Sequence, residues 1–82
     1  MLARVTRYYF DIRDDSGLYS DEEGLELPTQ REAEVEATRA LAGLARDLAT
    51  LDDRPDVAVE VRAADGRVFQ VALIFERNKI KQ

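Results

Sequence analysis

The segment of residues 57–73, with the sequence VAVEVRAADGRVFQVAL, determines the arrangement of two predicted strands. Its first part alternates valine with small or charged residues, and its second part is apolar at nearly every position. Asp65-Gly66 lies between the two parts and supplies turn chemistry, because aspartate bonds the local backbone and glycine accepts a positive φ. Period-two alternation beside such a turn predicts two antiparallel strands joined as a hairpin.

The length of the turn sets the register of this hairpin. A two-residue loop would place the valines and the apolar side chains of the second strand on opposite faces. A three-residue loop, 64–66, places both sets on one face, which predicts a type I turn with Gly66 in a G1 bulge. The predicted pairs are Val61 with Phe69, Val59 with Val71, and Val57 with Leu73.

An amphipathic helix is the clearest element upstream of this hairpin. Thr29 is a good N-cap, Glu32 completes a capping box, and residues 52–55 (Asp-Asp-Arg-Pro) end the helix. Alanines in its first half predict a close approach to the sheet, and we attribute Gly43, in the helix interior, to close packing as well. The apolar stripe comprises Ala33, Ala37, Ala40, Leu41, Leu44, Leu48 and Leu51.

Residues 5–13 predict a first strand, in which Tyr8, Phe10 and Ile12 share one face. Residues 14–17 (Asp-Asp-Ser-Gly) then turn the chain. The return strand begins at about Leu18, is interrupted by residues 21–24 (Asp-Glu-Glu-Gly), and resumes at residues 25–27. This interruption indicates an edge strand with a bulge or a second turn at Gly24.

The predicted fold class is α+β with the order β-β-α-β-β. We expect a four-stranded, mainly antiparallel sheet with one helix packed on one face. Residues 1–82 form a single domain, with an ordered core from about 5 to 76 and a C-terminal tail, 77–82, that is expected to fray. The strand order stays open, because the first strand can lie beside either strand of the second hairpin.

One helix covers only one face of such a sheet, so the other face is open. The last strand is apolar at nearly every position, which is typical of a strand that is buried on both sides. This pattern predicts a homodimer that forms through the open face. The residues expected at the contact are Tyr9, Ala58, Ala72 and Ile74.

Charge is distributed unevenly along the chain, whose formal net charge is −5. Residues 11–60 hold fifteen acids and five arginines, whereas the ends are basic. An alternative function is therefore a regulatory module that binds an unidentified protein or single-stranded RNA. Duplex nucleic acid is not an expected partner of so acidic a chain. The basic surface would comprise Arg62, Arg67, Arg77, Lys79 and Lys81.

The composition excludes several kinds of catalytic site. The chain has no cysteine and no histidine, so Ser-His-Asp and Cys-His arrangements and zinc sites on those ligands are absent. The acidic segment 11–23 matches a calcium loop poorly, because Arg13 and Ser16 stand where an oxygen ligand and a glycine are needed. Whether this segment binds a cation stays open. We expect no enzyme activity, no catalytic residue, no cofactor and no metal.

The sequence also bears on location. No apolar run approaches the roughly 20 residues that span a bilayer. Residues 1–7 lack the apolar region of a secretory signal. We expect a cytoplasmic protein that has no membrane partner.

Two segments of the chain carry a family resemblance: residues 7–14 (Arg-Tyr-Tyr-Phe-Asp-Ile-Arg-Asp) and residues 21–28 (Asp-Glu-Glu-Gly-Leu-Glu-Leu-Pro). With the alanine- and glutamate-rich helix, they resemble a family of small, uncharacterised alphaproteobacterial proteins that carry one domain of unknown function. The resemblance spans about residues 7–75, and many relatives have histidine in place of Asp11. It implies a bacterial origin but no activity, cofactor or catalytic residue. A looser, architectural likeness to the antitoxin half of bacterial RNA-targeting toxin–antitoxin pairs supports the protein-binding alternative.

Overall fold

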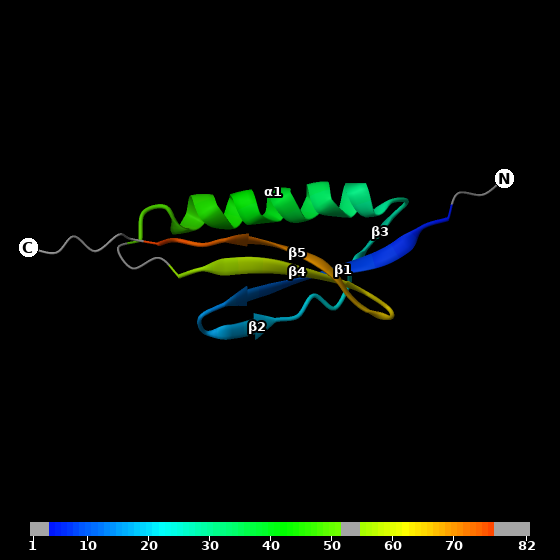
Figure 1. Ribbon diagram of the computed structural model, residues 1–82, viewed down its shortest axis with the longest axis horizontal. Coiled ribbons are helices and arrows are strands. Elements are labelled where there is room, and N and C mark those ends of the chain that lie inside the picture. Colours follow the sequence, from blue (N-terminus) through cyan, green and yellow to red (C-terminus); the bar gives the residue numbers. More distant parts are fainter. Residues whose placement is uncertain (1–3, 52–54, 77–82) are drawn as a thin grey trace, which may run out of the picture.

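The computed structural model describes residues 4–51 and 55–76 of the chain. One helix lies along one face of an antiparallel sheet, so the fold is α+β as predicted (Figure 1). The elements, in chain order, are β1 (Thr6–Asp14), β2 (Gly17–Tyr19), β3 (Leu25–Leu27), α1 (Gln30–Leu48), β4 (Val57–Ala63) and β5 (Gly66–Leu73). There are five strands rather than four, because the return strand is present as two short pieces, β2 and β3.

The sheet order is β2-β1-β4-β5, and every pairing is antiparallel. β1 is central, because it pairs with β4 on one side and with both β2 and β3 on the other. The sequence left open which strand of the second hairpin adjoins β1. It is β4, whose Val61 lies opposite Phe10 and whose Val59 lies opposite Ile12. β5 therefore forms one edge of the sheet, and no described strand pairs with its outer side.

The return strand is interrupted where the sequence predicts. β2 pairs with residues 12–14 of β1 and β3 pairs with residues 6–8, so the chain between them leaves β1. Gly24 has a φ of 72°, and a Cβ added there would lie 2.9 Å from the carbonyl oxygen of Tyr8. Both the dihedral angle and the close approach require glycine at the point where the chain returns to β1.

α1 begins at the predicted N-cap. The Thr29 hydroxyl oxygen accepts a hydrogen bond of 3.2 Å from the backbone N–H of Glu32, which satisfies a donor that has no partner within the helix. Ala33 and Ala37 are fully buried against the sheet, so the predicted close approach is confirmed. No helix in the described part of the chain is both long enough and apolar enough to cross a membrane.

Three expectations for the helix are wrong. Ala40 is exposed, because the buried face follows Ala33 and Ala37 to Leu41 and leaves Ala40 on the flank. Leu51 is exposed and lies beyond the helix end. Gly43 is not closely packed, since an added Cβ would meet no heavy atom within 4 Å.

The hairpin of β4 and β5 has the predicted apolar pairs, with Val61 opposite Phe69 at the end nearer the turn. The place of the bulge differs from the prediction. Arg62 lies opposite Arg67, so Val68 is the extra residue on β5, and the turn itself is only two residues long. The predicted three-residue loop with a G1 bulge at Gly66 is therefore wrong. The shift at Val68 has the same effect, because it keeps both apolar sets on one face.

The apolar core lies between α1 and the sheet. Side chains at alternate positions of β1, β4 and β5 enter it, so the intervening side chains point to the opposite face. Its buried members are Tyr8, Ala33, Ala37, Val59 and Val61, and Phe10, Ile12, Leu27, Leu41, Leu44, Phe69 and Val71 pack around them partly buried.

Candidate functional site on the open sheet face

The sheet face turned away from α1 is the candidate site, since no described element covers it (Figure 1). Cross-strand pairing arranges its side chains in three rows, each contributed by β1, β4 and β5 in turn. The rows are Tyr9, Arg62 and Arg67; then Asp11, Glu60 and Gln70; then Arg13, Ala58 and Ala72. We call the first two rows with Arg13 the polar half, and Ala58, Ala72 and Ile74 the apolar end.

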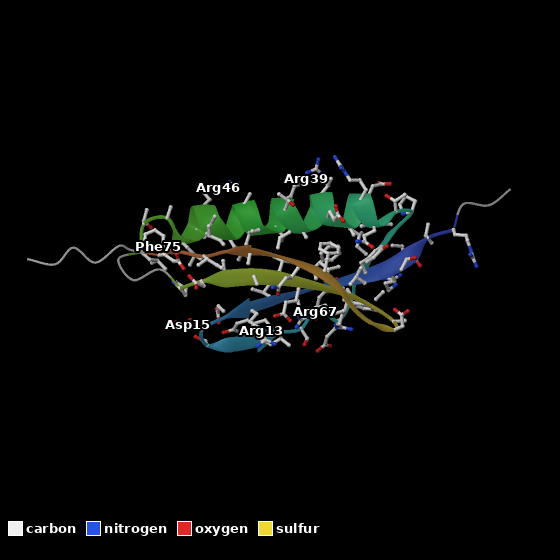
Figure 2. The ribbon with its side chains drawn as sticks, viewed as in Figure 1. Arg13, Asp15, Arg39, Arg46, Arg67 and Phe75 are labelled. Atoms are coloured by element: carbon white, nitrogen blue, oxygen red, sulfur yellow. The ribbon has the colours of Figure 1, made fainter. Side chains whose placement is uncertain are left out.

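Glu60 is the centre of the polar half. Its side chain is buried although it lies on an open face, with a residue exposure of 8%. One carboxylate oxygen accepts a hydrogen bond from Nε of Arg13, and the other accepts one of 3.1 Å from Nη2 of Arg67. Figure 2 shows Arg13 and Arg67 on the side of the sheet away from α1. The two guanidinium groups cover the carboxylate and neutralise it, which makes its burial tolerable.

Asp11 is the second buried acid of the polar half, with an exposure of 5%. Its Oδ2 accepts a hydrogen bond of 2.8 Å from Nε of Arg62, and its Oδ1 accepts one of 2.8 Å from the backbone N–H of Asp21. The Arg62 guanidinium lies 4.4 Å from the centre of the Tyr9 ring, within cation–π range. The hydrogen bond to Asp11 raises the pKa of Arg62, so the guanidinium group stays charged.

Asp21 joins the polar half to the interruption between β2 and β3. Its carboxylate accepts hydrogen bonds from the backbone N–H groups of Phe10, Glu23 and Gly24, at 3.1, 3.1 and 3.2 Å. Partial burial opposes its ionisation, but these three bonds and the charge of Arg62 outweigh that effect and lower the pKa of Asp21 below 3.8. The acidic run is therefore structural at this position, because Asp21 replaces the missing strand beside Phe10.

A polar recess of about 300 Å³ lies over this half of the face. Both of its carboxylates are held by arginines, as described above, so they are occupied as hydrogen-bond acceptors. Among residues 4–51 and 55–76, no group of three or more acidic side chains is placed to hold a metal ion. The lining residues are Asp11, Arg13, Leu18, Ser20, Glu60, Arg62 and Arg67.

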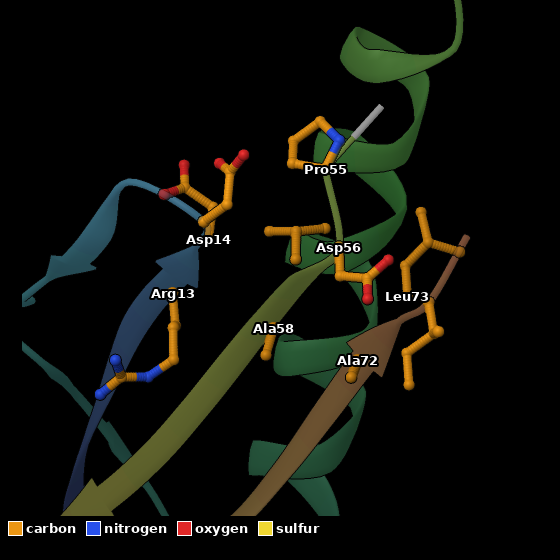
Figure 3. Close-up of a pocket in the computed structure, with 10 residues that line it drawn as sticks. Arg13, Asp14, Pro55, Asp56, Ala58, Ala72 and Leu73 are labelled. Carbon is orange, nitrogen blue, oxygen red and sulfur yellow. The ribbon is translucent and has the colours of Figure 1, made fainter. Parts of the chain in front are cut away.

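The apolar end holds the larger pocket, a groove of about 530 Å³ (Figure 3). Ala58 and Ala72 lie opposite each other on β4 and β5, and Ile74 continues the same face with 62% of its surface exposed. The groove runs across the ends of three strands. Its complete lining is Arg13, Asp14, Asp15, Pro55, Asp56, Val57, Ala58, Ala72, Leu73 and Ile74.

The structure brings together three of the four residues predicted for self-association. Ala58, Ala72 and Ile74 line one groove. Tyr9 lies two rows away, beyond the Asp11–Glu60 row and beneath Arg62, so it does not belong to the same patch.

The predicted basic surface is only partly described. Arg62 and Arg67 both lie on the polar half, where each forms an ion pair with a buried acid. The other three predicted residues, Arg77, Lys79 and Lys81, lie outside the described residues.

Sequence reasoning missed the acidic rim of the groove, formed by Asp14, Asp15 and Asp56. Asp14 and Asp15 were interpreted only as turn residues, and Asp56 was not singled out. These three acids line one groove because β1 ends beside the start of β4, and a single sequence did not reveal that neighbourhood. Once β4 is placed beside β1, the pairing of Ala58 with Arg13 puts the start of β4 next to the turn after β1. The sequence alone gives no signal for this pairing.

Comparison with known families finds a match over most of the chain. A family described as "Domain of unknown function (DUF6894)" covers residues 7–74. Neither the curated proteins nor the solved structures include a match. The match confirms the expected resemblance to an uncharacterised single-domain family. This family has no assigned role. The matched residues include the helix and all the described strands except the first residue of β1. The chain therefore belongs to the DUF6894 family.

Proposed function

We propose that this chain is a small, non-catalytic interaction protein that forms a homodimer through the apolar end of its open sheet face. The observation that carries the proposal is the exposure of Ile74 beside a groove with an alanine floor. An apolar patch on a sheet face that no helix covers favours a protein partner over solvent. A second copy is the simplest partner, because a two-fold axis lets the same patch serve both sides.

The chemistry of the polar half also supports association through the apolar end. Its acids and arginines already satisfy one another, so it gains little from a partner and remains compatible with water. The apolar end has no such arrangement. Burying the exposed part of Ile74 contributes about 1–2 kcal/mol for each copy, and further contacts along the groove would add to this to offset the entropy cost of association.

The chemistry of the described side chains supports a non-catalytic role. The acid with a shifted pKa is Asp21, whose pKa is lowered and whose oxygens accept backbone N–H groups. A general base needs a pKa near the working pH and a free oxygen directed at a substrate. Asp21 has neither.

Replacing Ile74 with glutamate tests the proposal. In the dimer, Ile74→Glu would place unpaired carboxylates in an apolar contact. We therefore expect the dimer dissociation constant to rise at least tenfold, so that the monomer becomes the main species. Light scattering coupled to size-exclusion chromatography measures the mass at several concentrations. Val35→Glu is the matched control, because Val35 is exposed on α1 and away from the groove. Equal mass for wild type and Ile74→Glu at every concentration would refute the proposed contact.

The alternative, a regulatory module that binds a protein or single-stranded RNA through basic residues, stays a prediction. The ion pairs of Arg62 and Arg67 with buried acids leave these two residues less available for phosphate than the sequence suggested. RNA binding that rests on charge weakens steeply between about 50 and 200 mM salt. A filter-binding titration at both salt concentrations distinguishes it from self-association. We also propose that the protein is bacterial and cytoplasmic.

A further inference from the structure

The groove at the apolar end has a specific chemistry. Its floor is apolar, from Ala58, Ala72 and Ile74, and its rim carries three carboxylates. Within the described residues, no arginine forms an ion pair with any of these three acids, since the nearby Arg13 is bonded to Glu60. The groove therefore fits a segment that combines an apolar side chain with flanking positive charge.

The chain contains such a segment directly after its described part. Residues 77–82 read Arg-Asn-Lys-Ile-Lys-Gln, which supplies three cations and one isoleucine. The described part of the chain ends at Glu76, two residues beyond Ile74, which itself lines the groove. The number of cations in the segment equals the number of acids on the rim.

We propose that residues 77–82 of one copy occupy the groove of a second copy, and that the exchange is reciprocal. Lys79 and Lys81 would face the acids of the rim, and Ile80 would lie on the alanine floor. This inference rests on the proposed self-association and names the segment through which it occurs.

The end of β5 favours exchange over binding within one copy. The backbone N–H of Phe75 donates a hydrogen bond of 2.8 Å to Oδ1 of Asp56, which keeps the chain beside β4 as it passes the groove. Ala72 and Ile74 precede this segment on the same chain, so Ile80 could reach the floor of its own groove only if the chain turned back on itself. The segment of a second copy can approach without this reversal.

Reciprocity accounts for how so short a segment could hold a dimer. Each ion pair at an exposed rim is weak, and salt screens it. Once the first segment is bound, the second binds within the same complex, and its effective concentration is far higher than the concentration of free protein. Two weak contacts of this kind reinforce each other.

Reversing the charges of both surfaces in separate full-length proteins tests the exchange. The first protein carries Asp15→Lys and Asp56→Lys, which makes the rim basic. The second carries Lys79→Glu and Lys81→Glu, which makes the segment acidic. We expect each protein alone to be monomeric where wild type is dimeric, and the mixture to form a heterodimer, because both of its contacts are then complementary.

Further variants and controls complete the test. Asp15→Lys alone replaces the double change if the loss of the Asp56 hydrogen bond impairs folding, and circular dichroism checks the fold of each variant. Arg31→Glu with Arg39→Glu is the control, because it reverses two exposed charges on α1 and should leave the wild-type dimer intact. A chain that ends at Glu76 should dimerise at least tenfold more weakly, and wild type should weaken by a similar factor of about ten between 50 and 500 mM salt.

The possible results separate the two proposals. Heterodimer formation on mixing supports the exchange. A chain ending at Glu76 that dimerises as tightly as wild type would overturn the exchange and leave the proposed self-association standing. Charge-reversed proteins that stay monomeric when mixed would also overturn it. A wild-type chain that is monomeric at all concentrations would overturn both.

Discussion

Asp21 shows how one side chain can replace a piece of strand. Where the return strand leaves β1, the backbone N–H of Phe10 has no strand partner on that side, and the Asp21 carboxylate accepts its hydrogen bond. The same carboxylate holds Glu23 and Gly24 in the turn that brings the chain back. A buried donor without a partner is costly, so this residue determines whether the interruption is stable.

Asp21→Asn should therefore destabilise the fold by about 1–2 kcal/mol at pH 7, because an amide is a weaker acceptor for three N–H groups. The folded pKa of Asp21 is lowered, so its stabilising contribution is complete above the unfolded value near 3.8 and is lost as the pH falls through the folded value. Urea unfolding at pH 7 and at about pH 2.5 should thus show a difference from wild type that shrinks in acid. Asp65→Asn, in the exposed turn, is the control. A cost that is the same at both pH values would contradict this account.

For single residues, the sequence predicted the face of the sheet on which a side chain lies better than it predicted the partners of that side chain in hydrogen bonds and ion pairs. The alternation of the two strands implies that Asp11 and Glu60 point away from the core positions beside them, and both lie on the open face. Their burial was not predictable, because it results from arginines on neighbouring strands covering them. Knowledge of the strand order is needed before such pairs can be identified.

The contact between α1 and the sheet depends on small side chains in the first half of the helix. Ala33 and Ala37 have no exposed surface and pack on Tyr8, Val59 and Val61. A larger side chain at either position would push the helix away from the sheet, since cores at native density have no room for added methylenes.

Ala37→Leu should accordingly destabilise the fold by about 1–3 kcal/mol through overpacking, in spite of the larger apolar side chain. Ala42→Leu is the matched control on the same helix, because Ala42 is exposed. Thermal or urea unfolding of the two variants measures the difference. Equal stability of both variants would show that the helix can move to accept the added volume.

At the scale of elements, local pattern predicted the helix start and the strand pairing of the second hairpin. The alternation of Val57, Val59 and Val61 against Phe69, Val71 and Leu73 fixed the register, because only one pairing buries both sets. The prediction of the turn was wrong because a bulge anywhere along the hairpin can bring both apolar sets onto one face. The pattern fixes the net shift of one residue but not its location at Val68.

At the scale of the whole molecule, the open face is divided between two kinds of surface. Three arginines and two buried acids form the polar half, and the groove occupies the opposite end. The fold class was predictable from the order of the elements, since one helix can cover one face of such a sheet. The division of the open face into these two surfaces was not predictable, because it depends on β1 lying beside β4.

If the groove holds a second copy, stability should depend on protein concentration. Association that occurs only in the folded state stabilises that state by mass action. We expect the wild-type unfolding temperature to rise by a few degrees, about 2–5 °C, over a hundredfold increase in concentration, and the Ile74→Glu temperature to stay constant. Differential scanning calorimetry measures both. A wild-type temperature that does not change with concentration would count against association.

The two edges of the sheet differ in a way that limits how copies can join side by side. On one edge, β1 is flanked by two strands of three residues each, with the Asp21 carboxylate between them. The other edge is β5, which is eight residues long and has its bulge at Val68. Among the described strands, only β5 offers another molecule an edge longer than three residues, and the bulge at Val68 shortens its regular part. Growth of the sheet from copy to copy would therefore end at a pair, because the opposite edge lacks a strand long enough to continue it.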